Sequence, residues 1–422
     1  MKKFAIIILL ASPQYLWAQS LSIQDLWNQY RGNSKYQQTV LNTQIKTQEL
    51  KELQTDRIPV FYVDGNLQHN IIIPTTPVPA IAFDPSAQEG AIIPLKFATK
   101  WSSKAGVQVE WKLFDPQRKY SEDQKSLEIE KAEIELQRTE ENWKKDATLA
   151  YAAVVLASYQ YQSALEDSVA YAEILQITKN RYKVGRESSS NYISAQQQFE
   201  RQLIQLYEAF YVLKQADLEL NNYIDIKQYK NLSSGFEDIK NAISPRDKNY
   251  YDIQSLMVDK RIVDNQWIAT KRQWLPSLTL NGYLGEQYYS NELRITRKEE
   301  WFGNSFINLA LRIPLSSYFT GQATLRKIQL NSKLIDLQIT EKQADDQSLH
   351  NKKQLKIAAA EEKLRRLEKI KALALQDMNE QREAYKAGRA LITMYNQSLT
   401  NYKKAEQDVW QAQYDLIKTI LD

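Results

Sequence analysis

The chain has few of the side chains on which enzymes rely. Its 422 residues include no cysteine and two histidines, His69 and His350. A catalytic triad or a cluster of imidazole and thiolate metal ligands needs more of these residues than one chain provides. The acidic pair Glu361-Glu362 lies in a solvated helical stretch, and the 11 glycines are scattered rather than gathered in a phosphate-binding loop. The sequence therefore predicts no enzyme, no cofactor and no metal site.

The N-terminus has the pattern of an export signal. Lysines precede an apolar run from Phe4 to Ala11, and Leu16-Trp17-Ala18 forms a cleavage boundary before Gln19. A single-span membrane anchor is the alternative, but the run has about half the length that a spanning helix requires. We therefore expect residues 1–18 to be a signal peptide. Because no other apolar stretch approaches about 18 residues, any membrane insertion is expected to use strands.

The overall composition favours long solvated helices. The net charge of +4 results from 55 basic and 51 acidic residues that are mixed along the chain, which does not indicate a nucleic-acid partner. Glycine and proline are scarce, with 11 of each. The 25 tyrosines and 9 tryptophans fit the aromatic belts at membrane interfaces, although helix packing would also use such residues.

A near repeat about 200 residues apart indicates that the chain is a duplication. The segment Arg181-Tyr182-Lys183-Val184-Gly185-Arg186 reappears as Ala384-Tyr385-Lys386-Ala387-Gly388-Arg389. Each copy precedes a similar helix, and at one fixed offset Tyr192, Phe199, Leu206 and Leu213 are matched by Tyr395, Tyr402, Val409 and Leu416. We expect two structural repeats, residues 19–228 and 246–422, separated by a connector at 229–245 with little regular structure.

Each repeat combines long helices with a pair of strands. Both long helices carry heptad spacing and would reach roughly 100 Å, and Gly185 and Gly388 fall where the chain must reverse. The expected helices span about 22–56, 117–184, 191–228, 322–387 and 391–421, with a further helix opening the second repeat. The predicted seam contains Ile129, Leu136, Trp143, Ala150, Ala157, Ala164 and Tyr171, and then Ile357, Ala360, Leu364, Leu367, Ala374, Met378 and Tyr385.

Four segments alternate apolar and polar residues with period two, at about 58–69, 105–114, 275–288 and 304–314. A half-buried soluble sheet would explain any one of them, whereas four together favour a membrane sheet. Open edges are not tolerated in lipid and four strands are too few to close a barrel, so several copies are expected to surround a water-filled lumen. The charged residues expected in the lumen are Asp64, Glu110, Lys112 and Arg312.

The order of these parts resembles the TolC family of outer-membrane channels, which are the exit ducts of tripartite efflux pumps and type I secretion systems. The resemblance covers essentially all of the mature chain. It implies a mainly helical homotrimer in which a twelve-stranded barrel continues into a twelve-helix coiled-coil tunnel in the periplasm. The most specific pieces are the two Tyr-x-x-Gly turns, Trp274-Leu275-Pro276-Ser277-Leu278 and Trp111-Lys112-Leu113-Phe114-Asp115.

The resemblance also implies roles for residues near the turns. The family's turns dock onto a periplasmic adaptor protein, although packing between coils is an alternative role for the tyrosines. Known members carry aspartates six and nine residues after the second turn glycine, where this chain has Met394 and Gln397, so a cation-binding gate is not carried over. The contact candidates are Tyr182, Gly185, Arg186, Tyr385, Gly388 and Arg389, and the constriction candidates are Asn191, Ser194, Met394, Tyr395 and Gln397.

The function expected from the resemblance is passive export through the outer membrane of a Gram-negative bacterium. The expected partners are two further copies of the chain, a periplasmic adaptor, an inner-membrane transporter and outer-membrane lipid. A duct for type I protein secretion is one alternative, and a periplasmic coiled-coil adaptor or scaffold is an alternative from another class. The sequence leaves open whether the cargo is a drug, a metal ion, another small molecule or a protein.

Overall fold

The computed structural model describes residues 19–224, 229–244, 249–387 and 389–422. The expected signal peptide at 1–18 and the turn residue Gly388 lie outside the described residues. The chain divides into two compact units. The turn unit comprises the chain up to Thr43 together with Ala132–Ser255 and Ile339–Asp422, and the sheet unit comprises Gln44–Lys131 and Leu256–Gln338.

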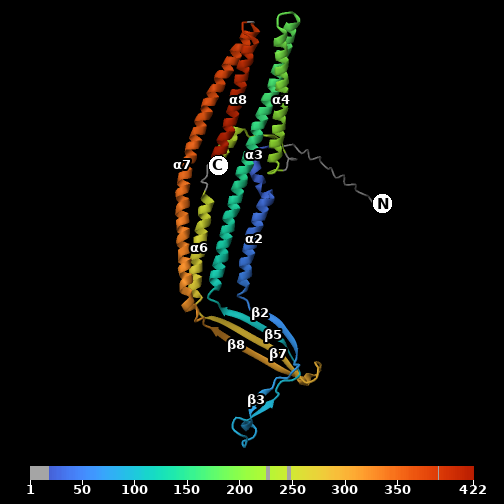
Figure 1. Cartoon of the computed structure of the whole chain (residues 1–422), viewed down its shortest axis with the longest axis vertical. Coiled ribbons are helices and arrows are strands. Elements are labelled where there is room, and N and C mark those ends of the chain that lie inside the picture. Colours follow the sequence, from blue (N-terminus) through green and yellow to red (C-terminus); the bar gives the residue numbers. More distant parts are fainter. Residues whose placement is uncertain (1–18, 225–228, 245–248, 388) are drawn as a thin grey trace, which may run out of the picture. The chain divides into compact units, whose positions relative to one another are not determined.

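A four-stranded antiparallel sheet is the centre of the sheet unit (Figure 1). Its strands are β2 (Val60–His69), β5 (Trp101–Phe114), β7 (Ser277–Ser290) and β8 (Trp301–Arg312), in the order β2-β5-β7-β8. Each repeat contributes one strand pair, and β5 pairs with β7 to join them. Within the described part of the chain, β2 and β8 are edge strands with one neighbour each.

The strand connections add short elements that the alternation did not predict. Between β2 and β5 lie the hairpin strands β3 (Thr76–Pro79) and β4 (Ile92–Leu95), with a single 3₁₀ turn, η2 (Ala80–Ala82), between them. A second 3₁₀ turn, η4 (Lys298–Glu300), precedes β8. The prolines of this hairpin lack an N–H donor, which suits a two-stranded ribbon with open edges.

Long uninterrupted helices follow the strand pairs in the chain. The two longest are α3 (Arg118–Lys183) and α7 (Ser317–Lys386), and each is followed by a shorter helix, α4 (Ser189–Leu220) and α8 (Ile392–Leu421) respectively. The helices preceding the strand pairs are α2 (Ser34–Thr55) and α6 (Tyr250–Arg272). No helix in the described part of the chain combines the length and the apolarity needed to cross a membrane.

The predicted heptad seam faces the interior of the helical packing. Trp143, Ala157 and Tyr171 of α3 are buried, as are Leu364 and Met378 of α7. These residues belong to apolar clusters that join α3, α7 and α8. The seam is therefore confirmed at these positions, because a heptad pattern places its apolar residues on one side of a helix.

The connector at 229–245 is more ordered than expected. It contains β6 (Tyr229–Leu232), which pairs in parallel with β1 (Gln19–Leu21), and α5 (Phe236–Ala242). The expectation of little regular structure is wrong here, because Phe236 and Ile239 are buried in the core of the turn unit. The first helix is also divided, into α1 (Ile23–Asn28), η1 (Gln29–Gly32) and α2.

The hydroxyl of Tyr151 fixes this core. It donates a hydrogen bond to the Leu21 carbonyl at 2.8 Å and accepts one from the Ser234 N–H at 3.0 Å. The ring is fully buried, as are Ile23, Leu26 and Leu220 around it. One side chain of α3 therefore bonds backbone groups of both β1 and the connector, and the Leu21 carbonyl also accepts from the Ser233 N–H at 3.0 Å.

Candidate functional site

The two helix turns of the turn unit share the same long backbone hydrogen bond. Gly185 has a φ of 73°, its N–H donates to the Tyr182 carbonyl at 3.0 Å, and the Arg186 N–H donates to the Arg181 carbonyl at 2.8 Å. This pair of bonds is a Schellman motif, in which a left-handed residue, usually glycine, ends the helix. In the second turn the equivalent long bond joins the Arg389 N–H to the Ala384 carbonyl at 2.8 Å.

A pair of stacked tyrosines closes each turn. The rings of Tyr182 and Tyr192 lie 5.2 Å apart between centroids, with an angle of 9° between their planes. The rings of Tyr385 and Tyr395 lie 6.0 Å apart at 13°. Both pairs join the end of a long helix to the start of the following short helix at the same ten-residue spacing. The duplication therefore extends to side-chain packing.

The equivalent tyrosines nevertheless differ in what covers them. Tyr182 is 41% exposed, whereas Tyr385 is 5% exposed and lies under the guanidinium of Arg181, whose carbon is 4.8 Å from the ring centroid. Burial raises the pKa of the Tyr385 hydroxyl, and the charge of Arg181 only partly opposes this. For Tyr385 the geometry is that of packing between helices. The asymmetry has a sequence origin, because the position of Arg181 is Ala384 in the second copy.

The remaining contact and constriction candidates lie mostly on the surface. Gly185, Arg186 and Arg389 are exposed around the turns, and Tyr395 is half-buried under Tyr385. The contact candidate Gly388 lies outside the described residues. The candidates six and nine residues after each turn glycine are exposed in both repeats and are Asn191, Ser194, Met394 and Gln397.

Met394 and Gln397 line a shallow groove of about 310 Å³ between α7 and α8. Asp377 and Gln381 of α7 line the same groove. The exposed carboxylate of Asp377 therefore lies beside Met394 and Gln397, the two positions at which known members of the TolC family carry aspartates. Sequence reasoning missed Asp377 because it belongs to the preceding helix rather than to the segment after the turn.

A buried ion cluster lies farther along the same helices. Lys403 Nζ of α8 is 3.2 Å from Asp167 Oδ1 of α3, 3.5 Å from Glu406 Oε2 and 3.6 Å from Glu166 Oε2. Glu406 also pairs with Lys371 of α7 at 3.1 Å. Although burial lowers the pKa of Lys403, the carboxylates of Asp167 and Glu406 outweigh it and raise that pKa overall. The cluster ties three helices of the turn unit together, and its central charges on Asp167, Lys403 and Glu406 are largely removed from water.

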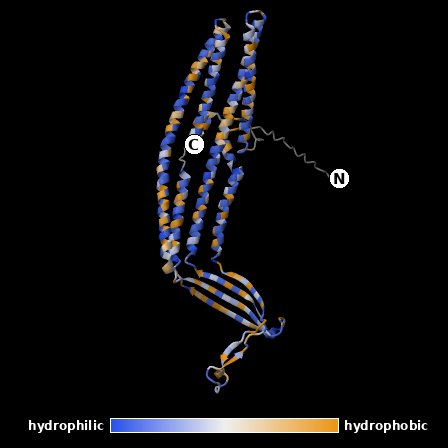
Figure 2. Ribbon diagram, viewed as in Figure 1, coloured by the Kyte–Doolittle hydropathy of each residue, from blue (hydrophilic) through white to orange (hydrophobic). Residues whose placement is uncertain are grey.

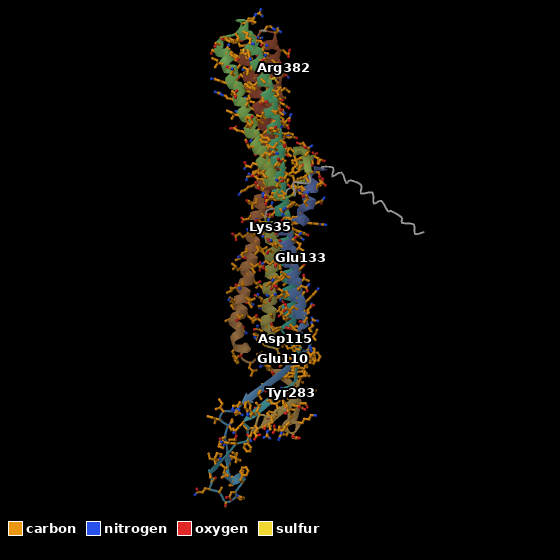
Figure 3. All side chains as sticks on the ribbon, turned by 90° about the vertical axis from the view of Figure 1, so that its right-hand side faces the viewer. Lys35, Glu110, Asp115, Glu133, Tyr283 and Arg382 are labelled. Carbon is orange, nitrogen blue, oxygen red and sulfur yellow. The ribbon has the colours of Figure 1, made fainter. Side chains whose placement is uncertain are left out.

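In the sheet unit, the register places the four predicted lumen residues on one face. Tyr62 pairs with Gln108, Gln108 with Tyr283, and Tyr283 with Phe306, so alternate residues of all four strands share this polar face. Figure 2 shows hydrophilic and hydrophobic residues alternating along the strands, and Figure 3 labels Glu110 and Tyr283 in the sheet. The charged residues on it are Asp64, Lys104, Glu110, Lys112 and Arg312.

Hydrogen bonds cross the strands on this polar face. The Tyr62 hydroxyl donates to Gln108 Oε1 at 2.7 Å, and Gln108 Nε2 donates to Asp64 Oδ2 at 3.2 Å. Sequence reasoning missed one member of the charged set, Lys104, because the expected strand began at residue 105 whereas β5 begins at Trp101.

The opposite face of the sheet is apolar and exposed. Val63, Leu284 and Ile307 are 84%, 70% and 82% exposed. Glu286, near one end of β7, is a charged exception. Large aromatic residues occur at both ends of this face. Trp101, Tyr288 and Trp301 gather at the end remote from the helices, and Trp111 lies at the other end, where its indole N–H donates to the Arg57 carbonyl at 2.9 Å.

Comparisons with known proteins identify the fold. No protein-family profile and no curated protein sequence matches the chain. Among solved structures, the chain is similar to the outer-membrane channel OprN (12% identity, TM-score 0.69) and to the outer membrane protein VceC of Vibrio cholerae (12%, 0.68). It is also similar to the MtrE outer membrane channel of Neisseria gonorrhoeae (14%, 0.68).

These similarities extend over nearly the whole chain. Each covers 94% of this chain, and they cover 88%, 94% and 87% of OprN, VceC and MtrE respectively. At such low identity, the agreement lies in the path of the backbone rather than in individual side chains. The chain has the fold of these outer-membrane channels.

Proposed function

We propose that the protein is the outer-membrane channel of a tripartite efflux pump. Three copies would form a twelve-stranded barrel that continues into a helical tunnel in the periplasm. The channel conducts cargo passively and catalyses no reaction. A periplasmic adaptor and an inner-membrane transporter deliver the cargo and supply the energy. The single observation that carries this proposal is the exposed apolar face of the four-stranded sheet, which is bordered by aromatic side chains at both ends.

The height of that face matches a bilayer. Trp101 and Trp111 are ten residues apart on β5. At about 3.4 Å per residue they are separated by roughly 34 Å along the strand, which becomes about 26 Å at the ~40° tilt usual in membrane barrels. The apolar band of such barrels is about 25 Å tall and is flanked by aromatic girdles. An exposed apolar band of this size marks a contact surface rather than a solvated one, and the aromatic residues at both of its ends favour a membrane.

The edges of the sheet support the assembly of several copies. β2 and β8 have 10 and 12 residues, similar lengths that allow β8 of one copy to pair with β2 of the next. Lipid provides no hydrogen-bond partners for an open edge, and four strands are too few to enclose a lumen. Closure by three copies places the polar face, with its five charged residues, around the water-filled interior.

The exposed turns of the turn unit support a docking role. In each repeat the turn presents a basic residue to solvent, Arg186 in the first and Arg389 in the second. Tyr182 adds an exposed aromatic ring. We assign the adaptor contact to these three side chains, with Gly185 shaping the turn, and the constriction to the exposed residues Asn191, Ser194, Met394 and Gln397, supported by Tyr395.

Membrane fractionation tests the proposal. The full-length protein, expressed with its N-terminal segment, is expected in the outer membrane, soluble only in detergent, as an oligomer of three chains that dissociates on heating in SDS. A periplasmic coiled-coil adaptor or scaffold, the alternative from another class, would not need detergent to remain soluble without its partners. Recovery of a soluble monomer after export would overturn the channel assignment.

A further inference from the structure

We propose that aromatic rings on the polar face form a track that guides flat aromatic anions through the channel. The inference rests on the proposed function and deepens it by naming a class of cargo. Phe302 and Phe306 lie four residues apart on β8, on the face that also carries Arg312. Polar residues are expected on this face. The rings on this face are Tyr62, Tyr283, Tyr289, Phe302 and Phe306.

The rings are arranged in successive pairs along β7 and β8. Tyr283 and Phe306 are direct cross-strand partners whose ring centroids lie 5.9 Å apart at an interplanar angle of 27°. Tyr289 and Phe302 lie 6.3 Å apart at 42°. The two phenylalanines are four residues apart, which is about 14 Å along a strand. A planar molecule leaving one pair would therefore reach the next within one short step.

Most of these rings are left uncovered by the chain itself. Tyr289, Phe302 and Phe306 are 45%, 54% and 47% exposed. A neighbouring copy paired to β8 would flank Phe302 and Phe306 in the plane of the sheet, since cross-strand neighbours stand beside one another on a face. Their outer surfaces would still face the lumen. Packing against a neighbouring copy therefore does not by itself explain why phenylalanine stands at these two positions.

Tyr283 gives the track a fixed floor. Its ring lies across the cross-strand glycine pair Gly106 and Gly285. A β-carbon at Gly106 would come within 2.7 Å of the ring, and one at Gly285 within 2.5 Å of the Tyr283 hydroxyl. The ring is 3% exposed, so it is held flat rather than projecting into the lumen. The two glycines therefore leave room for an aromatic ring to lie flat on the sheet.

The charges on the face select the sign of the cargo. Lys104, Lys112 and Arg312 outnumber Asp64 and Glu110, three to two, which gives +1 per chain. Lys104 Nζ lies 4.2 Å above the centroid of the Tyr283 ring. Among the described residues its ammonium contacts this ring and no carboxylate. An aromatic molecule with an acidic group can stack on the exposed rings while its anion meets Lys104.

Single-channel recording on the full-length oligomer in planar bilayers tests the track. The probe is naphthalene-2-sulfonate, and cyclohexanesulfonate is the matched anion without an aromatic face. On the unmodified channel we expect transient current blocks that last longer with the naphthalene probe. Replacing Phe302 and Phe306 by serine should shorten the blocks about two- to ten-fold per ring, the range expected for aromatic pairs. Asn304→Ser and Asn308→Ser, on the same strand face, should leave them unchanged.

A second variant separates stacking from charge. Lys104→Gln should shorten blocks by naphthalene-2-sulfonate and leave those by neutral 2-naphthalenemethanol unchanged. Equal block durations for the two sulfonates on a conducting, unmodified channel would overturn the track while leaving the channel function intact. Durations unaffected by the phenylalanine replacements would do the same. Absence of any ion conductance from the purified oligomer would instead refute the proposed function, and the track with it.

Discussion

The two helix turns share a sequence pattern, a long hydrogen bond across the turn and a tyrosine stack, yet they differ in their surroundings. Tyr182 is open to solvent, whereas Tyr385 is buried beneath Arg181. A duplication copies local structure, because a turn depends on a few adjacent residues. A contact between the two repeats involves a different residue from each repeat. Equivalent positions in the two repeats can therefore have different surroundings. The first turn leaves its ring exposed, and the second packs its ring between helices.

Substitutions at equivalent positions of the two repeats should differ most in their effect on the free energy of unfolding at the buried ion cluster. Lys403 corresponds to Glu200 in the first repeat, which is exposed. Lys403→Met should lower the free energy of unfolding by about 3 to 5 kcal/mol, because it leaves Asp167 and Glu406 buried without this cation. Glu200→Gln is the control and should have little effect. Thermal unfolding in detergent, followed by helical circular dichroism, measures both, and equal losses would contradict the comparison.

The pH dependence of this cluster follows from the raised pKa of Lys403. A basic group with a raised pKa in the folded state contributes stability that is fully present below its ordinary pKa of 10.5. That contribution disappears as the pH rises through the higher value of the folded protein. The difference in the free energy of unfolding between the native protein and Lys403→Met should therefore shrink as the pH rises through the raised pKa of Lys403. Because burial also raises the pKa of Asp167, the difference should shrink at acidic pH as well, where that carboxyl is protonated and no longer needs a cation.

The stacked tyrosines provide the next test. Tyr385→Ala removes a buried ring packed against Tyr395 and Arg181 and should cost about 3 kcal/mol. Tyr182→Ala removes an exposed ring stacked on Tyr192 and should cost about 1 kcal/mol or less. The order should be reversed in export assays. Tyr182→Ala should lower export more than Tyr385→Ala does, in trimers that remain intact. Equal thermal destabilisation by the two variants would mean that the turns are equivalent after all.

The sheet is the region where the sequence predicted most. Strand alternation has a period of two, and an antiparallel register preserves the faces, so Asp64, Glu110, Lys112 and Arg312 were assigned to one face correctly. Long-range contacts between helices could not be predicted in the same way. The approach of Arg181 to Tyr385, the partners of Lys403 and the position of Asp377 depend on the relative rotation of helices over many turns. The order of the connector was missed because its polar residues and Gly235 resemble a loop.

The strand pairs of the two repeats should respond alike, unlike the turns. Val109 of β5 and Leu309 of β8 lie on the apolar face, and arginine at either position should cost about 2 to 4 kcal/mol near the middle of a bilayer. Gln108→Ser and Asn308→Ser change the polar face and should leave the oligomer intact. The temperature at which the oligomer dissociates in SDS reports the difference. Equal effects of the two classes would show that the faces are assigned wrongly.

Valine at the turn glycine should have a smaller effect. Gly185 has a φ of 73°, a conformation that β-branched residues disfavour, so Gly185→Val should strain the turn by about 1 kcal/mol or more. The matching sequence predicts a similar result for Gly388→Val. Because the turn and the sheet belong to separate units, export should fall while trimers still assemble. Loss of trimers in both variants would assign the glycines to assembly instead.

The smallest expected effect concerns divalent cations at the periplasmic entrance. Met394 and Gln397 carry no charge, so cations added from the periplasmic side should block the single-channel current only weakly. Asp377 lines the same groove, and its carboxylate is the group there that could bind a divalent cation and increase the block. Strong block that persists in Met394→Ala and Gln397→Ala and disappears in Asp377→Asn would transfer the acidic role to α7. Weak block that none of the three substitutions changes would support an entrance closed by uncharged side chains.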